Sequence, residues 1–285
     1  METRKNKPPI FIVGLLRSGT TLLRAMLGQH SAIASGLETK WFELDWKGSH
    51  DAEFQASIDR LRQFFGLDQA AMQRAVDESR TTLEFLDRFL SAYAASAGKT
   101  RWAEKTPASI LHLDEIYRQW PDAKVIHSLR DPRDVYASMK ESNRYGGVPG
   151  FVRMWCDFLG AGEKAKERLH LSPDRFLQVR YESLVTNPER TMRRVTDFVG
   201  EPWEPAVARF EGRSEDFDKV LAITGHASTT LKQLKNPLHT ERIGNWKNVA
   251  TEAEVEQIRD GVKSHGLLDL FDMLVQETST FKPGA

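Results

Sequence analysis

The chain has 285 residues, and its 40 basic and 40 acidic side chains give a formal net charge of zero at pH 7. Such a balance provides no overall field that would attract nucleic acid or an anionic membrane, so neither is predicted as a partner. The length suits one α/β domain, residues 1–285, better than two full domains. The single cysteine, Cys156, excludes an internal disulfide framework and a cysteine-based zinc site.

The cysteine content and the first residues also suggest a compartment. One cysteine fits a reducing environment. No stretch approaches the roughly 18 apolar residues of a membrane span, and the polar residues 1–7 lack the apolar core of a signal peptide. We therefore predict a soluble, cytoplasmic protein without a membrane span, and we leave a homodimer open.

The first predicted unit is a strand, a loop and a helix. The apolar residues 10–13 predict a buried parallel strand, residues 14–21 a turn, and residues 22–27 the first helix. A strand, a glycine loop and a helix N-terminus form an anion site, because free N–H groups and the helix dipole point to one place.

The residues of this loop restrict which anion it can bind. Gly14 and Gly19 have the spacing of the GxxxxGK[ST] loop, whose lysine reaches the β- and γ-phosphates of ATP or GTP. Here Thr20 occupies the lysine position, and the cation of the loop is Arg17. The loop is therefore predicted to hold a phosphate-type ligand that is not a nucleoside triphosphate.

A helical insertion is predicted next. After a short strand end and loop at residues 35–40, apolar residues recur at helical spacing through much of residues 41–98. The predicted helices cover residues 52–65, 68–80 and 83–97. This insertion is expected either to pack against the edge of the sheet or to form a lid or an acceptor-binding wall.

The rest of the chain alternates strands and helices. Strands are predicted at residues 124–129 and 175–181, and helices at residues 133–140, 151–169 and 188–199. Pro132 is well placed at the start of the helix that follows the first of these strands. The alternation predicts a P-loop-like, three-layer α/β fold with a central parallel sheet flanked by helices.

Three candidate ligand-binding residues follow predicted strands. Arg17, Arg130 and Tyr181 lie at or just beyond strand ends, where parallel sheets bind their ligands. The loop with Arg17 would bind one anionic group. A second could be held by Arg130 together with Ser138, which follows Arg130 by about two helical turns. The alternative for Arg130 is an ion pair with Asp131 or Asp134.

Several segments together resemble a known family. The chain is similar to sulfotransferases that use 3′-phosphoadenosine 5′-phosphosulfate (PAPS). The similarity runs from residue 9 to about residue 248, and Glu104 replaces the usual aspartate of the family's "DKTP" segment. The matching blocks are residues 16–23, 102–107, 120–138, and 230–238 with 243–248.

The resemblance implies a role for each matching residue. The 5′-phosphosulfate would be held by the loop residues Arg17, Ser18, Gly19, Thr20 and Thr21. The 3′-phosphate would be held by Arg130 and Ser138, and Tyr181 would lie near the nucleotide. Thr230 and Lys235 would close over the 3′-phosphate side, and Trp246 would be a packing residue. The resemblance implies PAPS as donor, 3′,5′-ADP as product, and no metal.

The resemblance also implies a catalytic carboxylate. Gly36, Glu38 and Thr39 match the Gly-x-Glu-Thr context of the tyrosylprotein and carbohydrate-type branches, so Glu38 is the predicted base. Without this context Glu38 would be a solvated loop carboxylate. The other candidates for the base are His112, His127 and His30, of which His127 is better explained as a core histidine with its hydrogen bonds satisfied.

The predicted reaction is an in-line displacement at sulfur, for which charge on the leaving oxygen must be stabilised. Lys105 is the candidate for this role, with Arg17 as its partner. The alternative for Lys105 is an ion pair with Glu104 or an exposed surface position. Competing functions are a P-loop-type kinase of a small molecule and an inactive nucleotide-binding regulator.

The acceptor is not predicted beyond a peptide tyrosine, a carbohydrate, a lipid or a small molecule. Residues 41–98 and 144–154 are the expected acceptor walls, since they are rich in aromatic side chains that suit any of these. Those side chains are Trp41, Phe42, Trp46, Phe64, Phe65, Tyr145 and Phe151.

Overall fold

A five-stranded parallel sheet forms the centre of the protein. The computed structural model describes residues 7–44, 46, 52–143, 146–213 and 215–279. The strands, in the spatial order β2-β3-β1-β4-β5, are all parallel to their neighbours. They are β1 (Ile10–Gly14), β2 (Ile33–Ser35), β3 (Arg101–Lys105), β4 (Lys124–Leu129) and β5 (Phe176–Arg180). The predicted α/β fold with a central parallel sheet is confirmed.

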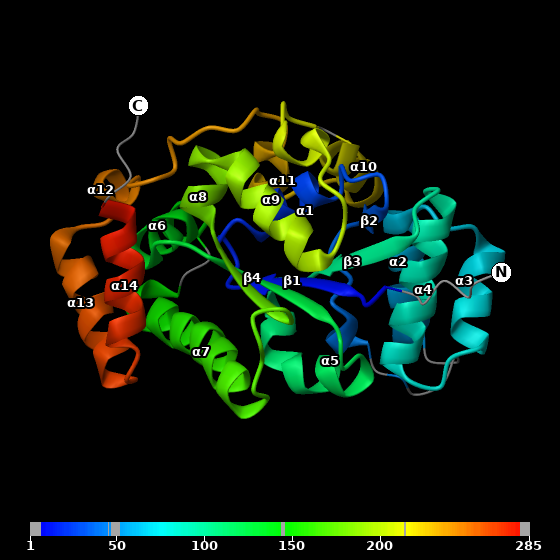
Figure 1. Cartoon of the computed structure of the whole chain (residues 1–285). Coiled ribbons are helices and arrows are strands. Elements are labelled where there is room, and N and C mark those ends of the chain that lie inside the picture. The colour runs from blue at the N-terminus through cyan, green and yellow to red at the C-terminus, as the bar shows by residue number, and fades with distance from the viewer. Residues whose placement is uncertain (1–6, 45, 47–51, 144–145, 214, 280–285) are drawn as a thin grey trace.

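Helices cover both faces of this sheet (Figure 1). The residues of β1 show why, because the whole strand is buried and successive side chains point to opposite faces. Ile10 and Ile12 belong to the core with α1 (Thr20–Leu27) and α9 (Pro188–Val199). Phe11 and Val13 belong to the core with α5 (Leu113–Gln119), on the face that α7 (Gly147–Arg168) also covers.

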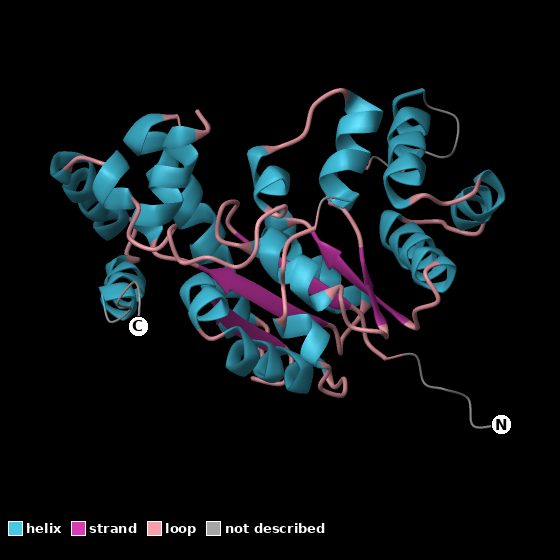
Figure 2. Cartoon of the chain, turned by 90° about the horizontal axis from the view of Figure 1, so that it is seen from above, coloured by secondary structure: helices cyan, strands magenta, loops and turns pink. Residues whose placement is uncertain are grey.

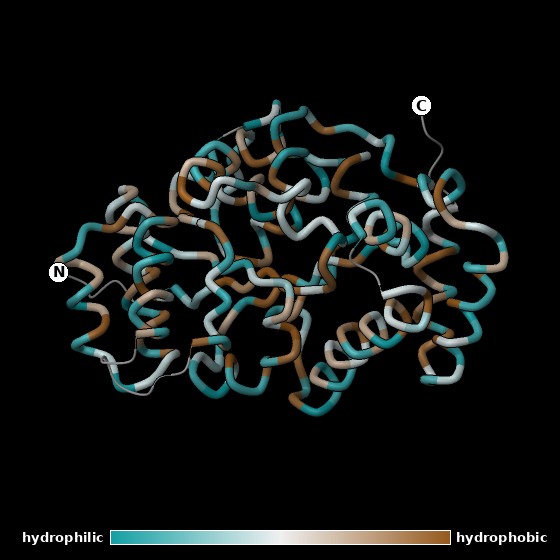
Figure 3. Tube along the Cα trace, turned by 180° about the vertical axis from the view of Figure 1, so that it is seen from behind, coloured by the Kyte–Doolittle hydropathy of each residue, from teal (hydrophilic) through white to brown (hydrophobic). Residues whose placement is uncertain are grey.

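The insertion and the C-terminal helices lie at opposite ends of the molecule (Figures 1 and 2). The insertion comprises the short helix η1 and α2, α3 and α4, and the C-terminal group comprises α13 and α14 beside α6. The bounds are η1 (Trp41–Glu43), α2 (Ala52–Phe65), α3 (Gln69–Asp77), α4 (Thr82–Ser96), α6 (Pro132–Glu141), α13 (Glu252–Ser264) and α14 (Leu268–Ser279). Figure 3 shows many of the hydrophobic stretches gathered in the middle of the molecule.

The remaining described helices lie, in sequence, between the elements already named. They are η2 (Pro107–His112), α8 (Tyr181–Thr186), η3 (Pro205–Ala208), α10 (Glu215–Thr224), α11 (Thr229–Gln233) and α12 (Trp246–Val249). The helices α10 and α11 contain no buried residue, so little apolar burial holds them in place.

The sequence did not predict β3 as a strand, although it lies between β1 and β2. Three of its five residues are charged, which hides the apolar pattern of a central strand. In the structure these charges are buried with partners: Arg101 pairs with Glu201, Lys105 with Glu38, and hydroxyl groups surround Glu104.

Candidate active site

The loop after β1 has the backbone geometry of an anion cradle. Gly14, Arg17 and Gly19 have positive φ angles of 141°, 70° and 93°. The helix α1 begins at Thr20, two residues earlier than predicted, and its N-cap Gly19 provides no side-chain cap. The first N–H groups of the helix are therefore free to bind an anion. A Cβ on Gly19 would lie 2.7 Å from Cδ2 of Tyr181, so glycine is required there.

A cavity of about 660 Å³ lies at the carboxyl edge of the sheet and joins ten of the twelve predicted site residues. These ten are Arg17, Gly19, Thr20, Thr21, Glu38, Lys105, Arg130, Ser138, Tyr181 and Thr230. The parallel strands explain this convergence, because their carboxyl ends all meet at one edge.

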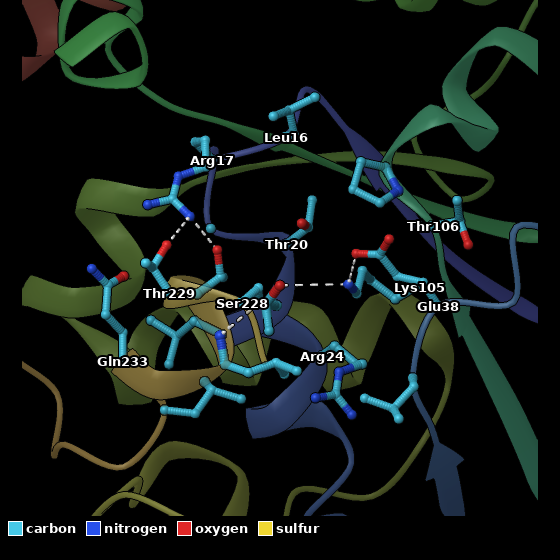
Figure 4. A pocket seen from close by; sticks show the side chains of 18 of the residues that line it. Leu16, Arg17, Thr20, Arg24, Glu38, Lys105, Thr106, Ser228, Thr229 and Gln233 are labelled. Carbon is cyan, nitrogen blue, oxygen red and sulfur yellow. Dashed lines mark hydrogen bonds and ion pairs between the residues drawn. The ribbon is translucent and has the colours of Figure 1, made fainter. Parts of the chain in front are cut away.

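Arg17 is anchored from two sides of the cavity. Its Nε donates a hydrogen bond of 2.8 Å to Oγ of Ser138. Its guanidinium also donates to the hydroxyls of Thr229 and Thr230 on α11 (Figure 4). The two predicted phosphate-binding regions are therefore adjacent, since Arg17 of one region contacts Ser138 of the other.

Arg130 is 7% exposed and also lines the cavity. Its guanidinium donates to the carbonyl oxygens of Arg17 and Arg242 and lies 4.5 Å from the ring centroid of Tyr181. Among the described residues Arg130 forms no ion pair with Asp131 or Asp134, the predicted alternative. Asp131 binds Arg133 at 2.7 Å, and Asp134 accepts hydrogen bonds from the backbone N–H groups of Gly244 and Trp246. Among the described residues nothing accepts a hydrogen bond from the buried Nε of Arg130.

Glu38 and Lys105 form an ion pair inside the cavity (Figure 4). The Lys105 side chain is 4% exposed and that of Glu38 38% exposed. The Nζ of Lys105 lies also 3.4 Å from Oγ1 of Thr21, so the lysine stands between the loop and the carboxylate. The predicted alternative, a pair between Lys105 and Glu104, is not what the structure contains.

The electrostatic environment keeps Glu38 ionised. Burial raises its pKa, but the charge and hydrogen bond of Lys105, with the charges of Lys40 and Arg24, outweigh burial. The pKa of Glu38 therefore lies below its ordinary value. A carboxylate in this form can accept a proton.

Two predicted site residues do not line the cavity. Ser18 is buried under the loop, and its carbonyl accepts a hydrogen bond from Ser128. The Nζ of Lys235 pairs with Asp218 at 3.1 Å, outside the cavity lining.

The histidines considered as alternative bases also do not line the cavity. His112 pairs with Glu115, and His30 binds the carbonyl of Pro202. His127 is fully buried as expected, but neither ring nitrogen has a partner among the described residues, so the prediction of satisfied hydrogen bonds is wrong.

The sequence also missed residues of the cavity wall that follow residue 205. Ser228, Thr229 and Arg242 line the cavity from the segment that contains α11 and the loop after it. Arg24 on α1 lines it as well and pairs with Asp216 on α10. The i, i+4 spacing of Thr20 and Arg24 on α1 was the available signal that Arg24 faces the cavity.

The insertion packs against the sheet and also contributes to the cavity lining, while its predicted role as a lid or acceptor-binding wall stays a prediction. Its helix α4 packs against β2 and β3, while Phe42, Arg60 and Phe64 line the cavity. Of the other predicted wall aromatics, Trp41, Phe65 and Phe151 are buried in the core, and Trp46 packs against it. Tyr145 lies outside the described residues. Among the described residues no group of three or more His, Cys, Asp or Glu could hold a metal.

Comparison with known proteins places this geometry in a family. The sequence model described as "Sulfotransferase family" matches residues 8–205. Protein-tyrosine sulfotransferase 1 of Danio rerio is 28% identical over 254 residues, which cover 85% of this chain. The chain spans 66% of the length of that relative, and 47% and 31% of two others.

Two solved structures share the fold. The sulfotransferase domain of the Synechococcus PCC 7002 olefin synthase has a TM-score of 0.67 and 18% identity. The match covers 93% of this chain and 97% of that domain. Mouse sulfotransferase SULT7A1 in complex with PAP has a TM-score of 0.52 and 14% identity. This match covers 95% of this chain and 89% of the mouse protein's chain. At these identities the likeness establishes the fold.

The predicted cytoplasmic localisation is wrong. The chain's relatives include several protein-tyrosine sulfotransferases, which act outside the cytoplasm. One cysteine and a polar first segment do not determine a compartment. In the part of the chain that the structure describes, no helix has the length and apolarity needed to cross a membrane.

Proposed function

The chain belongs to the sulfotransferase family, and we propose that it moves a sulfuryl group from PAPS to a hydroxyl or amine of an acceptor. The observation that carries this proposal is the convergence of Arg17, Lys105, Arg130 and Glu38 on one cavity beside an uncapped helix N-terminus. Threonine at the position of the P-loop lysine counts against the kinase alternative.

The residues of the cavity fit a donor with two separated anionic groups. The free N–H groups of α1, with Arg17 and Lys105, suit a phosphosulfate. Arg130 and Ser138 line the same cavity, and together they suit a second phosphate. The guanidinium of Arg130 lies over the ring of Tyr181, which also lines the cavity, so an aromatic side chain adjoins the same region.

The division of labour in the mechanism follows from these positions. PAPS supplies the sulfuryl group, whose bond to the acceptor oxygen forms as its bond to the 5′-phosphate oxygen breaks. Glu38, held as the carboxylate, takes the proton of the acceptor. Lys105 and Arg17 provide positive charge where the leaving oxygen becomes negative. Lys105 can serve both groups, because its Nζ already lies between Thr21 and Glu38.

The acceptor enters from the side of the insertion in this proposal. Phe42 and Phe64 form an apolar wall of the cavity. Arg60 adds a positive charge, because its guanidinium carbon lies 5.8 Å from the ring centroid of Phe64. The names of the matched relatives make a peptide tyrosine the first acceptor to test.

Two measurements test the donor and the reaction. The product nucleotide 3′,5′-ADP should raise the melting temperature without magnesium. Stabilisation only by ATP with magnesium would support a kinase instead. Transfer of labelled sulfate from PAPS to tyrosine peptides, glycans, lipids and phenols should then identify an acceptor. Binding of 3′,5′-ADP without turnover on any acceptor or on water would support the inactive regulator.

A further inference from the structure

A second carboxylate, Glu104, lies directly behind the Glu38–Lys105 pair. It precedes Lys105 on β3 and is 1% exposed. No cation of the described residues lies within ion-pair distance of it, since Lys105 binds Glu38 instead. A buried carboxylate without a cation is costly unless other donors satisfy it.

Four hydrogen bonds converge on this carboxylate. The hydroxyls of Thr39 and Thr106 donate to Oε1 at 2.8 and 2.5 Å. The backbone N–H of Thr106 and the hydroxyl of Ser109 donate to Oε2 at 3.1 and 3.3 Å. Both oxygens of Glu104 are therefore fully engaged by neutral donors.

Through these donors Glu104 holds the three residues that follow Glu38. Thr39 is bound directly. The backbone N–H of Lys40 donates to Oγ1 of Thr106 at 3.1 Å, and Nε1 of Trp41 donates to Oγ of Ser109 at 3.1 Å. Each of these two hydroxyls in turn donates to Glu104, so both residues are held through one intermediate group.

The backbone of this loop needs such support. Lys40 has a φ of 51°, an unfavourable conformation for a residue with a side chain. Its N–H bond to Thr106 is one contact that holds it there. Glu104 therefore supports the strained loop from the strand residue next to Lys105, the proposed catalytic lysine.

We propose that Glu104 is a positioning residue, whose carboxylate fixes the loop 39–41 and thereby sets the place of Glu38 relative to Lys105. This inference rests on the proposed function for the roles of Glu38 and Lys105. The claim that Glu104 holds the loop stands on the contacts alone and can be tested separately.

The test substitutions are Glu104→Gln and Glu104→Asp. An amide of the same shape cannot accept all four bonds, and the backbone N–H of Thr106 cannot turn away as a hydroxyl can. Aspartate keeps the charge but is one methylene shorter. Glu201→Gln is the matched control, because Glu201 is another buried carboxylate that binds Arg101 at the opposite end of β3.

Hydrogen exchange measures the loop without any acceptor. In Glu104→Gln we expect the amides of residues 38–44 to exchange at least tenfold faster, while those of β1 change no more than in Glu201→Gln. If Glu104→Gln does not fold, Thr106→Val removes the bond to the Lys40 N–H and should give the same local increase. Unchanged exchange in this loop, or an increase equal to that in the control, would overturn the proposal.

Turnover distinguishes positioning from a general loss of stability. Release of 3′,5′-ADP from PAPS, with water or an identified acceptor attacking sulfur, should fall at least tenfold in Glu104→Gln. Glu104→Asp should recover part of it, and the thermal shift caused by 3′,5′-ADP should stay near that of the wild type. Equal losses of turnover in Glu104→Gln and Glu201→Gln would refute the role. If the wild type releases no 3′,5′-ADP, the proposed function fails, and hydrogen exchange still decides the positioning.

Discussion

Replacing Arg130 by alanine tests the assignment of the second phosphate. We expect this change to weaken binding of 3′,5′-ADP far more than binding of 5′-AMP, because only the former carries a 3′-phosphate. The Arg130 side chain lines the cavity, where its guanidinium can donate a hydrogen bond to a phosphate oxygen. A hydrogen bond from a charged group is worth about 1.5–3 kcal/mol, so the affinity for 3′,5′-ADP should fall roughly 10- to 150-fold.

The assay is titration calorimetry of both nucleotides with the wild type and the variant. Arg133→Ala is the control, because Arg133 follows closely on the same segment but binds Asp131 and lies over Trp246. This control should leave both affinities nearly unchanged. Arg130→Ala also frees the carbonyls of Arg17 and Arg242, so folding is checked by thermal unfolding. Equal losses for the two nucleotides would refute the assignment of Arg130 to the 3′-phosphate.

Further substitutions probe the loop, the catalytic pair and the core. Glu38→Gln and Lys105→Ala should each lower turnover by about 10²–10⁴-fold while 3′,5′-ADP still binds; near-native turnover would exclude that residue. Gly19→Ala should abolish stabilisation by 3′,5′-ADP in a thermal shift assay, because its Cβ would meet Tyr181 at 2.7 Å; retained stabilisation would contradict the cradle geometry. Burial lowers the pKa of His127 to about 3 in the folded protein. As the pH falls, this histidine is therefore protonated in the unfolded chain before it is protonated in the folded one. The free energy of unfolding should therefore decrease as the pH drops below about 6.5, and the decrease should reach roughly 2 kcal/mol at pH 5. Urea unfolding of His127→Leu should show a smaller decrease of this free energy between about pH 6.5 and pH 5 than the wild type shows. A decrease equal to that of the wild type would exclude His127 as the source of the pH dependence.

The sequence alone predicted the elements whose residues carry a local pattern. The runs at β1, β4 and β5 are apolar enough to be recognised as buried strands, and glycine at positions 14 and 19 marks the loop between β1 and α1. Ten of the twelve predicted site residues line one cavity. They could be predicted because each follows a strand or belongs to a recognisable motif.

Tertiary structure decided what depends on partners distant in sequence. The strand β3 looks too polar to be central until Glu201, Glu38 and the hydroxyls around Glu104 satisfy its charges. Lys235 carries the charge expected of a residue that binds phosphate, but it pairs with Asp218 and does not line the cavity. The sequence lists the charged residues of this protein, while their pairing depends on which strands and helices the fold brings together.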